Sequence, residues 1–129
     1  MSLNYVTLGT NNPARAKLFY AALMGALGGI MTADHEGYTF CYDLPAGGRI
    51  WITRPQDKGV ATFGNGVTIG ITTASESKVK AAHAAALTAG GLNEGDPGPR
   101  PMFGPEFYGG YVRDLDGNKL ALVHYRSIE

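Results

Sequence analysis

An internal repeat is the feature of this sequence that most limits what it can fold into. At one constant spacing, residues of the first half align with residues of the second half: Tyr5 with Thr68, Leu8 with Ile71, Asn12 with Ser75, Ala26 with Ala89, and Gly28 with Gly91. Further on the spacing lengthens, and Arg49-Ile-Trp-Ile aligns with Lys119-Leu-Ala-Leu. A repeat that places the same helix-capping residues at the same points predicts two copies of one structural unit.

Each copy has the pattern of a strand, a helix and three further strands. In the first copy a strand is predicted at about 3–10, and Asn12-Pro13 then predicts a helix start, because an amide oxygen caps the first turn and proline suits it. Apolar residues recur every three or four positions until Gly28-Gly29, which ends the helix. Turn residues then separate three strands, predicted at about 30–35, 37–44 and 49–53.

The second copy repeats this order and adds an insertion. A strand is predicted at 67–73, followed by a helix from about Ser75 that ends near Gly90-Gly91. The proline-rich segment 96–105 is expected to be neither regular strand nor helix. The closing stretch 111–125 predicts a hairpin, with Gly117 and Asn118 tolerating positive φ in a turn that serves folding.

Neither copy can bury both its helix stripe and its sheet face alone, so the two are expected to pair. The predicted class is α+β: two βαβββ repeats forming a curved eight-stranded mixed sheet around a cleft, with the helices outside. We place repeat one at about 3–55 and repeat two at about 66–126 within a single domain, 1–129, a size that suits one domain. Pockets are expected where the repeats meet.

The balance of charges and the pattern of apolar residues limit the classes of partner that this chain is expected to bind. Eleven basic and eleven acidic residues balance, and no stretch concentrates Lys or Arg, which argues against nucleic acid or an acidic membrane. No run approaches the ~20 apolar residues that cross a bilayer, and the first residues lack a signal-peptide pattern. The single cysteine, Cys41, is expected to be buried filler in a reducing compartment. We therefore expect a soluble, cytoplasmic protein with a small-molecule partner.

Three stretches together resemble a known superfamily: "YVTLGTNNPARAKLFYAALMGALG", "GNGVTIGITTASESKVKAAHAAALTAGGLNEGDPGPRP" and "FYGGYVRDLDGNKLALVHY". The chain resembles the glyoxalase/bleomycin-resistance/extradiol-dioxygenase superfamily, also called vicinal oxygen chelate proteins, along nearly its whole length. The closing hairpin is the most specific of the three. The resemblance implies the paired βαβββ fold, usually in a homodimer, around a divalent metal that chelates two adjacent substrate oxygens.

The same resemblance implies where metal ligands should stand. In this chain those positions hold Tyr5 and Thr68, where histidine is usual in the superfamily, Trp51, where a ligand sometimes stands, and Ala121, where glutamate is usual. A phenol, an indole, a hydroxyl and a methyl group form no standard divalent site. We predict no metal and no cofactor, with a divalent ion such as Zn, Ni or Mn at a non-standard site as the alternative.

These four residues are instead predicted to line the cleft. Trp51 either packs in the core or forms a wall on which a planar ligand stacks, and the Tyr5 hydroxyl could donate a hydrogen bond. The resemblance places the insertion over the cleft mouth, so Phe103 and Tyr108 are candidate lining residues, the insertion being either a lid or an ordinary surface excursion.

The three histidines have structural explanations. His83 falls on the inner stripe of the second helix and is expected to be semi-buried and hydrogen-bonded. His35 stands at an apparent turn and is expected to be exposed. His124 differs in strand parity from Ala121, so it should face the opposite side of the sheet.

Three functions follow from this pattern. The first is a glyoxalase/bleomycin-resistance-like protein with a degenerate metal site that binds a small apolar or aromatic molecule. The second is an enzyme, a lyase or isomerase similar to lactoylglutathione lyase, with an atypical or displaced metal or with Tyr5 as an acid, in which a residue such as Glu106 would supply the base. The third is an antibiotic-sequestering or scaffold protein.

Overall fold

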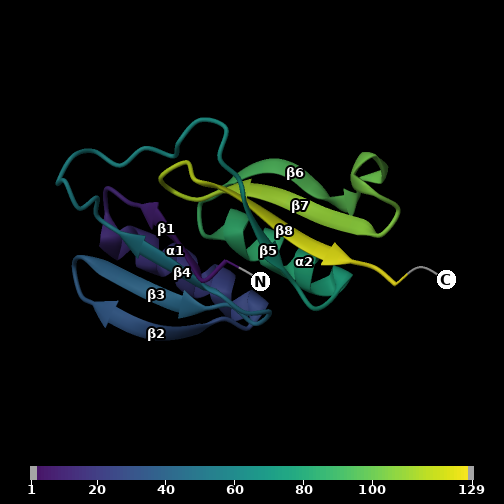
Figure 1. Cartoon of the computed structure of the whole chain (residues 1–129), viewed down its shortest axis with the longest axis horizontal. Helices are drawn as coiled ribbons and strands as arrows, with labels where there is room; N and C mark the ends of the chain where they lie inside the picture. The colour runs from purple at the N-terminus through teal and green to yellow at the C-terminus, as the bar shows by residue number, and fades with distance from the viewer. Residues whose placement is uncertain (1–2, 128–129) are drawn as a thin grey trace.

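The computed structural model describes residues 3–127, which form two βαβββ units in chain order (Figure 1). The first unit contains β1 (Tyr5–Gly9), α1 (Pro13–Leu27), β2 (Ile30–His35), β3 (Thr39–Asp43) and β4 (Arg49–Thr53). The second contains β5 (Ile69–Thr72), α2 (Glu76–Thr88), β6 (Leu92–Pro99), the short 3-10 helix η1 (Pro101–Phe103), β7 (Phe107–Arg113) and β8 (Lys119–Tyr125). The predicted α+β class and the order of elements in both repeats are confirmed.

The eight strands form two four-stranded mixed sheets, with strand orders β1-β4-β3-β2 and β5-β8-β7-β6. The pairs β1–β4 and β5–β8 are parallel, and the remaining pairs are antiparallel. Within residues 3–127, β1 and β5 each have a hydrogen-bonded neighbour on one side only, so the two sheets are not joined into one. Each unit therefore has an edge strand, β1 or β5, that is not hydrogen-bonded to a strand of the other unit.

The helix ends follow the capping chemistry of the sequence. The Asn12 side chain accepts a hydrogen bond from the Arg15 amide at 3.1 Å, and Ser75 does the same for Lys78 at 3.1 Å. The first helix ends at Gly28, whose φ of 88° is in the left-handed region that glycine enters without strain. The predicted helix starts are confirmed in both repeats.

The main core lies between the helices and the two sheets. Both helices lie behind the sheets in Figure 1, and α1 packs against α2. One continuous cluster joins residues of both units, among them Phe19 and Ile50 from the first and Val79, Leu120 and Leu122 from the second. Because the units share this core, one face of each sheet is buried and the opposite face is left for a binding site.

The proline-rich insertion is more regular than its sequence predicts. The strand β6 runs through Pro97 and ends at Pro99, so the expectation that this segment contains no strand is wrong in its first part. The reason is that β6 is an edge strand, where proline needs no ladder partner, and its register shifts between Asn93 and Gly95 and again between Gly95 and Gly98. Beyond Pro99 the chain makes the turn of η1.

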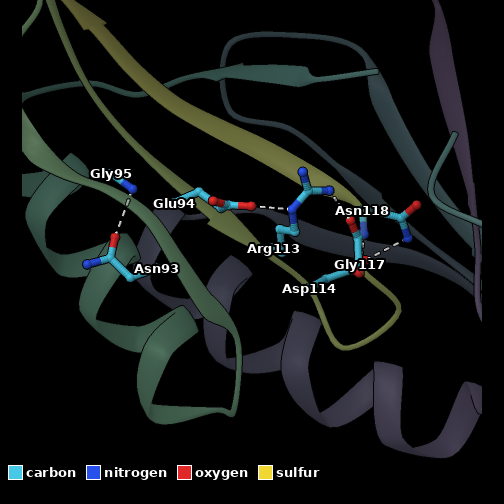
Figure 2. A network of polar contacts seen from close by, with 7 residues as sticks. All are labelled: Asn93, Glu94, Gly95, Arg113, Asp114, Gly117 and Asn118. Carbon is cyan, nitrogen blue, oxygen red and sulfur yellow. Dashed lines mark hydrogen bonds and ion pairs between the residues drawn. The ribbon is translucent and has the colours of Figure 1, made fainter. Parts of the chain in front are cut away.

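The turn between β7 and β8 connects the two units. The Asp114 carboxylate accepts hydrogen bonds from the amides of Asp116 and Asn118, both at 2.9 Å, and the Asn118 side chain donates to the Gly9 carbonyl at 3.1 Å. Figure 2 shows Asp114 and Asn118 facing each other in this turn. Of the two residues expected to tolerate positive φ, Gly117 adopts 89°, whereas Asn118 does not and contributes its side-chain amide instead. This turn serves the fold.

Candidate functional site

Strand alternation in the first sheet separates a core face from an open face. On β4, Ile50 and Ile52 are buried in the core, so Trp51 between them projects from the opposite face. On β1, Leu8 is buried whereas Tyr5 is 56% exposed. Tyr5 and Trp51 therefore lie on the open face of the first sheet, as the repeat alignment predicts for positions on these strands.

A cavity of about 450 Å³ lies on this open face. It is lined by six residues of the first unit: Tyr5, Thr7, His35, Thr39, Trp51 and Thr53. Thr7 is the register partner of Trp51 on one side, and Cys41 is its partner on the other. The cavity thus combines two aromatic side chains with hydroxyl and imidazole groups, a composition typical of a site for a small organic molecule.

His35 is a lining residue that sequence reasoning misses. It is exposed, as expected, but it ends the strand β2 and lines the same cavity as Trp51. A register shift between Met31 and Ala33 changes the parity of β2, and the preceding residue, Asp34, pairs with Lys17 of α1 on the other side of the sheet. The alternation of β2 alone could not place His35, because a bulge is not visible in the apolar pattern.

A second cavity, of about 340 Å³, lies between the edge strands β1 and β5. Tyr5 and Val6 line it from the first unit, and the run from Thr68 to Thr72 lines it from the second. Tyr5 lines both cavities, whereas Thr68 and Trp51 share neither. The structure therefore brings Tyr5 together with each of them separately, at the place where the two repeats meet.

Part of the open face of the second sheet is apolar. Ala121 is 6% exposed and packs with Phe107 and Val123 in a small cluster apart from the main core. Phe103 of η1 adds its ring to this cluster, with its centroid 5.3 Å from that of Phe107 in an edge-to-face arrangement. Ala121 and Phe103 are thus on the same face of the second sheet.

Tyr108 lies on the other face. It is 5% exposed and belongs to the main core, on the same side of β7 as Val112. The physical reason is parity: Phe107 and Tyr108 are adjacent on one strand, so only one can face the open side. The ring of Tyr108 lines no open-face cavity of residues 3–127, which corrects its expected position.

Glu106 lies away from the residues around Tyr5. It immediately precedes β7, its side chain packs close to Gly104, and its carbonyl accepts a hydrogen bond from the Arg126 amide at 2.7 Å. It lines neither of the cavities that contain Tyr5. The structure therefore does not bring the candidate acid and the candidate base together.

The other two histidines are engaged in the fold. His83 is 4% exposed, and its Nε2 lies 3.1 Å from Asn93 Oδ1, as expected for a buried, hydrogen-bonded residue of α2. The Nδ1 of His124 lies 3.2 Å from the Thr73 carbonyl oxygen. Neither histidine shares the open-face position of Ala121.

The residues at the implied ligand positions do not fit a divalent metal. Tyr5, Thr68, Trp51 and Ala121 offer a phenol, a hydroxyl, an indole and a methyl group, of which none is a usual ligand of Zn, Ni or Mn. Within residues 3–127, no group of three or more His, Cys, Asp or Glu side chains is arranged to hold a metal ion. We therefore assign no chemical step to a metal, and the predicted absence of a cofactor stays a prediction.

Two ion pairs of the first unit lie outside the lining of the first cavity. Arg49 Nε lies 2.6 Å from Asp43 Oδ1, where the two residues are register partners on β4 and β3. The Asp34 partner of Lys17 raises the pKa of that lysine, mainly through their hydrogen bond. The six residues that line the first cavity include no Lys, Arg, Asp or Glu, so the His35 imidazole is its basic group.

Comparisons with known proteins identify the fold family. Neither the protein-family models nor the curated proteins searched contain a match to this sequence. Among solved structures, a glyoxalase/bleomycin resistance protein from Albidiferax ferrireducens T118 is 36% identical, with a TM-score of 0.83 over 95% of this chain and 97% of that one. This chain belongs to the glyoxalase/bleomycin resistance protein family. The resemblance stated from the sequence is confirmed.

More distant structures share the fold alone. A glyoxalase-related enzyme from Fulvimarina pelagi is 20% identical, with a TM-score of 0.70 over 96% of this chain and 88% of that one. A lactoylglutathione lyase from Agrobacterium tumefaciens is 15% identical, with a TM-score of 0.65 over 95% and 92% of the two chains. In the part of this family member that the structure describes, no helix is long and apolar enough to cross a membrane.

Proposed function

We propose that this member of the glyoxalase/bleomycin resistance protein family binds a small apolar or aromatic molecule on the open faces of its sheets, without a bound divalent metal. The observation that supports this most directly is the cavity of about 450 Å³ lined by Tyr5 and Trp51. Aromatic side chains offer large contact areas to planar ligands, and the threonine and histidine groups beside them can orient polar substituents.

The donor set supports the metal-free part of the proposal. A catalytic divalent site needs about three protein ligands with nitrogen, sulfur or carboxylate donors and an open position. The implied positions supply none of these donors. Metal analysis of the purified protein is expected to give well under one equivalent of Zn, Ni or Mn per chain. One tightly held equivalent would overturn this part and favour the lyase or isomerase alternative.

Ligand binding can be tested with a neutral aromatic probe, N-phenyl-1-naphthylamine, whose emission rises when it leaves water. The wild-type chain is expected to bind it with a saturable increase in probe emission. Trp51→Ala removes one aromatic wall of the cavity and is expected to weaken binding at least about fivefold, the range of an aromatic contact worth ~1 kcal/mol or more.

Tyr38→Ala is the matched control for this substitution. Tyr38 is another partly exposed aromatic residue of the first unit, but it lines cavities that contain neither Tyr5 nor Trp51. The control is expected to bind the probe as the wild type does. No saturable binding to the wild type, or equal affinities for wild type and Trp51→Ala, would contradict the proposed site.

The proposal includes a homodimer. The edge strands β1 and β5 and the exposed Tyr5 beside them are surfaces that a second copy could cover. Light scattering is expected to give a mass of twice 13.6 kDa. A monomer at micromolar concentration would exclude this part and leave the ligand-binding part unaffected.

A further inference from the structure

The open face of the second sheet changes in character along its length. On β8, the alternate residues Lys119, Ala121, Val123 and Tyr125 share this face, and they pair in register with Arg113, Tyr111, Gly109 and Phe107 on β7. At 3.3–3.4 Å per residue, this two-strand strip is roughly 20 Å long. We name these eight residues, together with Phe103, the β7–β8 strip.

One end of the strip is cationic. Lys119 Nζ lies 5.4 Å from the centroid of the Tyr111 ring, and the Arg100 guanidinium lies 5.6 Å from the same centroid. Next to them, Arg113 pairs with Glu94 and donates to the Gly117 carbonyl at 2.7 Å (Figure 2). Two cationic groups thus contact one aromatic ring, whereas the guanidinium of Arg113, the register partner of Lys119, lies 5.1 Å from the centroid of the Phe63 ring.

These cations outnumber the carboxylates beside them. Among residues 3–127, no carboxylate lies within ion-pair distance of Lys119 or Arg100, and Glu94 pairs with Arg113. Asp96 is nearby in sequence, but its Oδ1 accepts from the Asn93 side chain, whose own Oδ1 lies beside His83 of α2. The pKa of Glu94 is held below its usual value, mainly by its hydrogen bond from Arg113 and also by the charge of Lys119. The surplus charge at this end is positive.

The opposite end of the strip is aromatic. Phe107 has edge-to-face contacts with Phe103 and Tyr125, at centroid distances of 5.3 Å and 5.9 Å. Phe107 itself is buried, whereas Phe103 and Tyr125 are 58% and 57% exposed. Gly109 has no side chain, and a Cβ atom added there would lie 2.9 Å from the Phe107 ring. The middle of the strip is therefore flat. Two exposed rings therefore border an apolar floor.

From this gradient we infer that the ligand is a small amphipathic anion, with its acidic group at Lys119 and its aromatic or acyl body along the strip toward Phe103. The inference rests on the proposed function, since it names the chemical class of the bound molecule and assigns its contacts on the second sheet, whose strip shares no residue with the lining of the Trp51 cavity. The positive charge at this end favours an anionic ligand. Partly exposed cations attract an anion more strongly when apolar groups beside them lower the local dielectric constant. A neutral or cationic ligand would supply no anion to Lys119, whereas Arg100 already donates hydrogen bonds to the backbone carbonyls of Asp96, Gly98 and Pro99.

Two probes of nearly equal shape test this inference. 8-Anilinonaphthalene-1-sulfonate has a sulfonate on the skeleton of N-phenyl-1-naphthylamine, which is neutral. The wild type is expected to bind the sulfonate probe at least about fivefold more tightly, and this preference should shrink as salt rises from about 0.02 to 0.5 M. Lys119→Met is expected to weaken the sulfonate probe about threefold to fivefold, as one partly exposed charge pair would, and to leave the neutral probe unchanged.

Two further variants complete the test, one as a control and one at the apolar end of the strip. Lys80→Met removes an exposed lysine on α2 and is the matched control, expected to leave both affinities unchanged. Phe103→Ala is expected to weaken both probes by a similar factor, because it removes part of the apolar end. Thermal unfolding of each variant checks that the fold is intact.

The outcomes separate this inference from the proposed function. If the wild type binds neither probe, the proposed function and the inference both fail. If it binds both probes equally, or if Lys119→Met changes the two affinities equally, the inference fails and the proposed function stands. If a second copy of the chain covers the strip, Phe103→Ala converts a dimer to a monomer in light scattering and Lys119→Met has no effect on either probe, which also overturns the inference.

Discussion

The Tyr20 hydroxyl donates a hydrogen bond of 2.6 Å to the Asp114 carboxylate, and both side chains are buried. Tyr20 is part of α1 in the first unit, whereas Asp114 begins the β7–β8 turn of the second. Burial raises the pKa of both groups, and the charge of Asp114 raises that of Tyr20 further. This contact is therefore a polar joint between the two repeats, next to the hydrogen bond from the Asn118 side chain to the Gly9 carbonyl.

Tyr20→Phe is expected to destabilise the protein by about 1–3 kcal/mol, because it leaves a buried carboxylate oxygen without one of its donors. The ring remains, so the apolar packing against Phe19 and Phe40 should be preserved. Urea unfolding followed by Trp51 fluorescence measures the change. Tyr38→Phe, at an exposed tyrosine, is the control and should match the wild type. A Tyr20→Phe variant as stable as this control would show that the joint contributes nothing.

Asp114→Asn is expected to change how stability depends on pH. Because the folded pKa of Asp114 is raised above its ordinary 3.8, the native state binds more protons than the unfolded state between those two values. The contribution of Asp114 to stability is therefore largest below pH 3.8 and falls as pH rises through the folded pKa. The destabilisation caused by Asp114→Asn should be larger at pH 3.5 than at pH 7, measured by urea unfolding. A difference that grows with pH would contradict the assigned direction.

The repeat in the sequence is sufficient to predict the element order and the helix starts, but it leaves open whether Trp51 packs in the core or lines the cleft. It could not place His35, because the bulge in β2 reverses its parity, nor separate Phe107 from Tyr108, because that depends on the register of β7. The structural roles of the glycines are also only partly predictable from the sequence. Gly91 reads as a helix-ending glycine, yet the positive φ at that point, 102°, belongs to Gly90. Close packing between the units, which no local pattern encodes, explains Gly91.

Gly91→Ala is expected to destabilise the protein by about 2–3 kcal/mol, the range of an overpacked core position. A methyl group there would lie 2.8 Å from the Arg113 carbonyl oxygen, 2.9 Å from the Ala86 carbonyl oxygen and 2.9 Å from the Phe19 ring. Gly25→Ala is the matched control: it lies inside α1, and its added methyl group meets nothing within 4 Å. The control should stabilise by about 0.5–1 kcal/mol through helix propensity. Thermal unfolding compares the two, and equal effects would refute the packing argument.

Ala121→Glu tests whether position 121 can hold the carboxylate that the family resemblance implies. Ala121 is packed among Phe107, Val123 and Tyr111, so a glutamate there is expected to cost about 2–3 kcal/mol at pH 7 through overpacking and desolvation. Burial should raise the pKa of the new carboxyl above about 4.3, so the loss should grow as pH rises through that range. Ala84→Glu, on the exposed side of α2, is the control and should change stability by less than about 0.5 kcal/mol. If urea unfolding finds both variants equally stable, the open face at position 121 has room for a ligand-facing carboxylate. The assignment of position 121 to the apolar part of the strip would then be wrong.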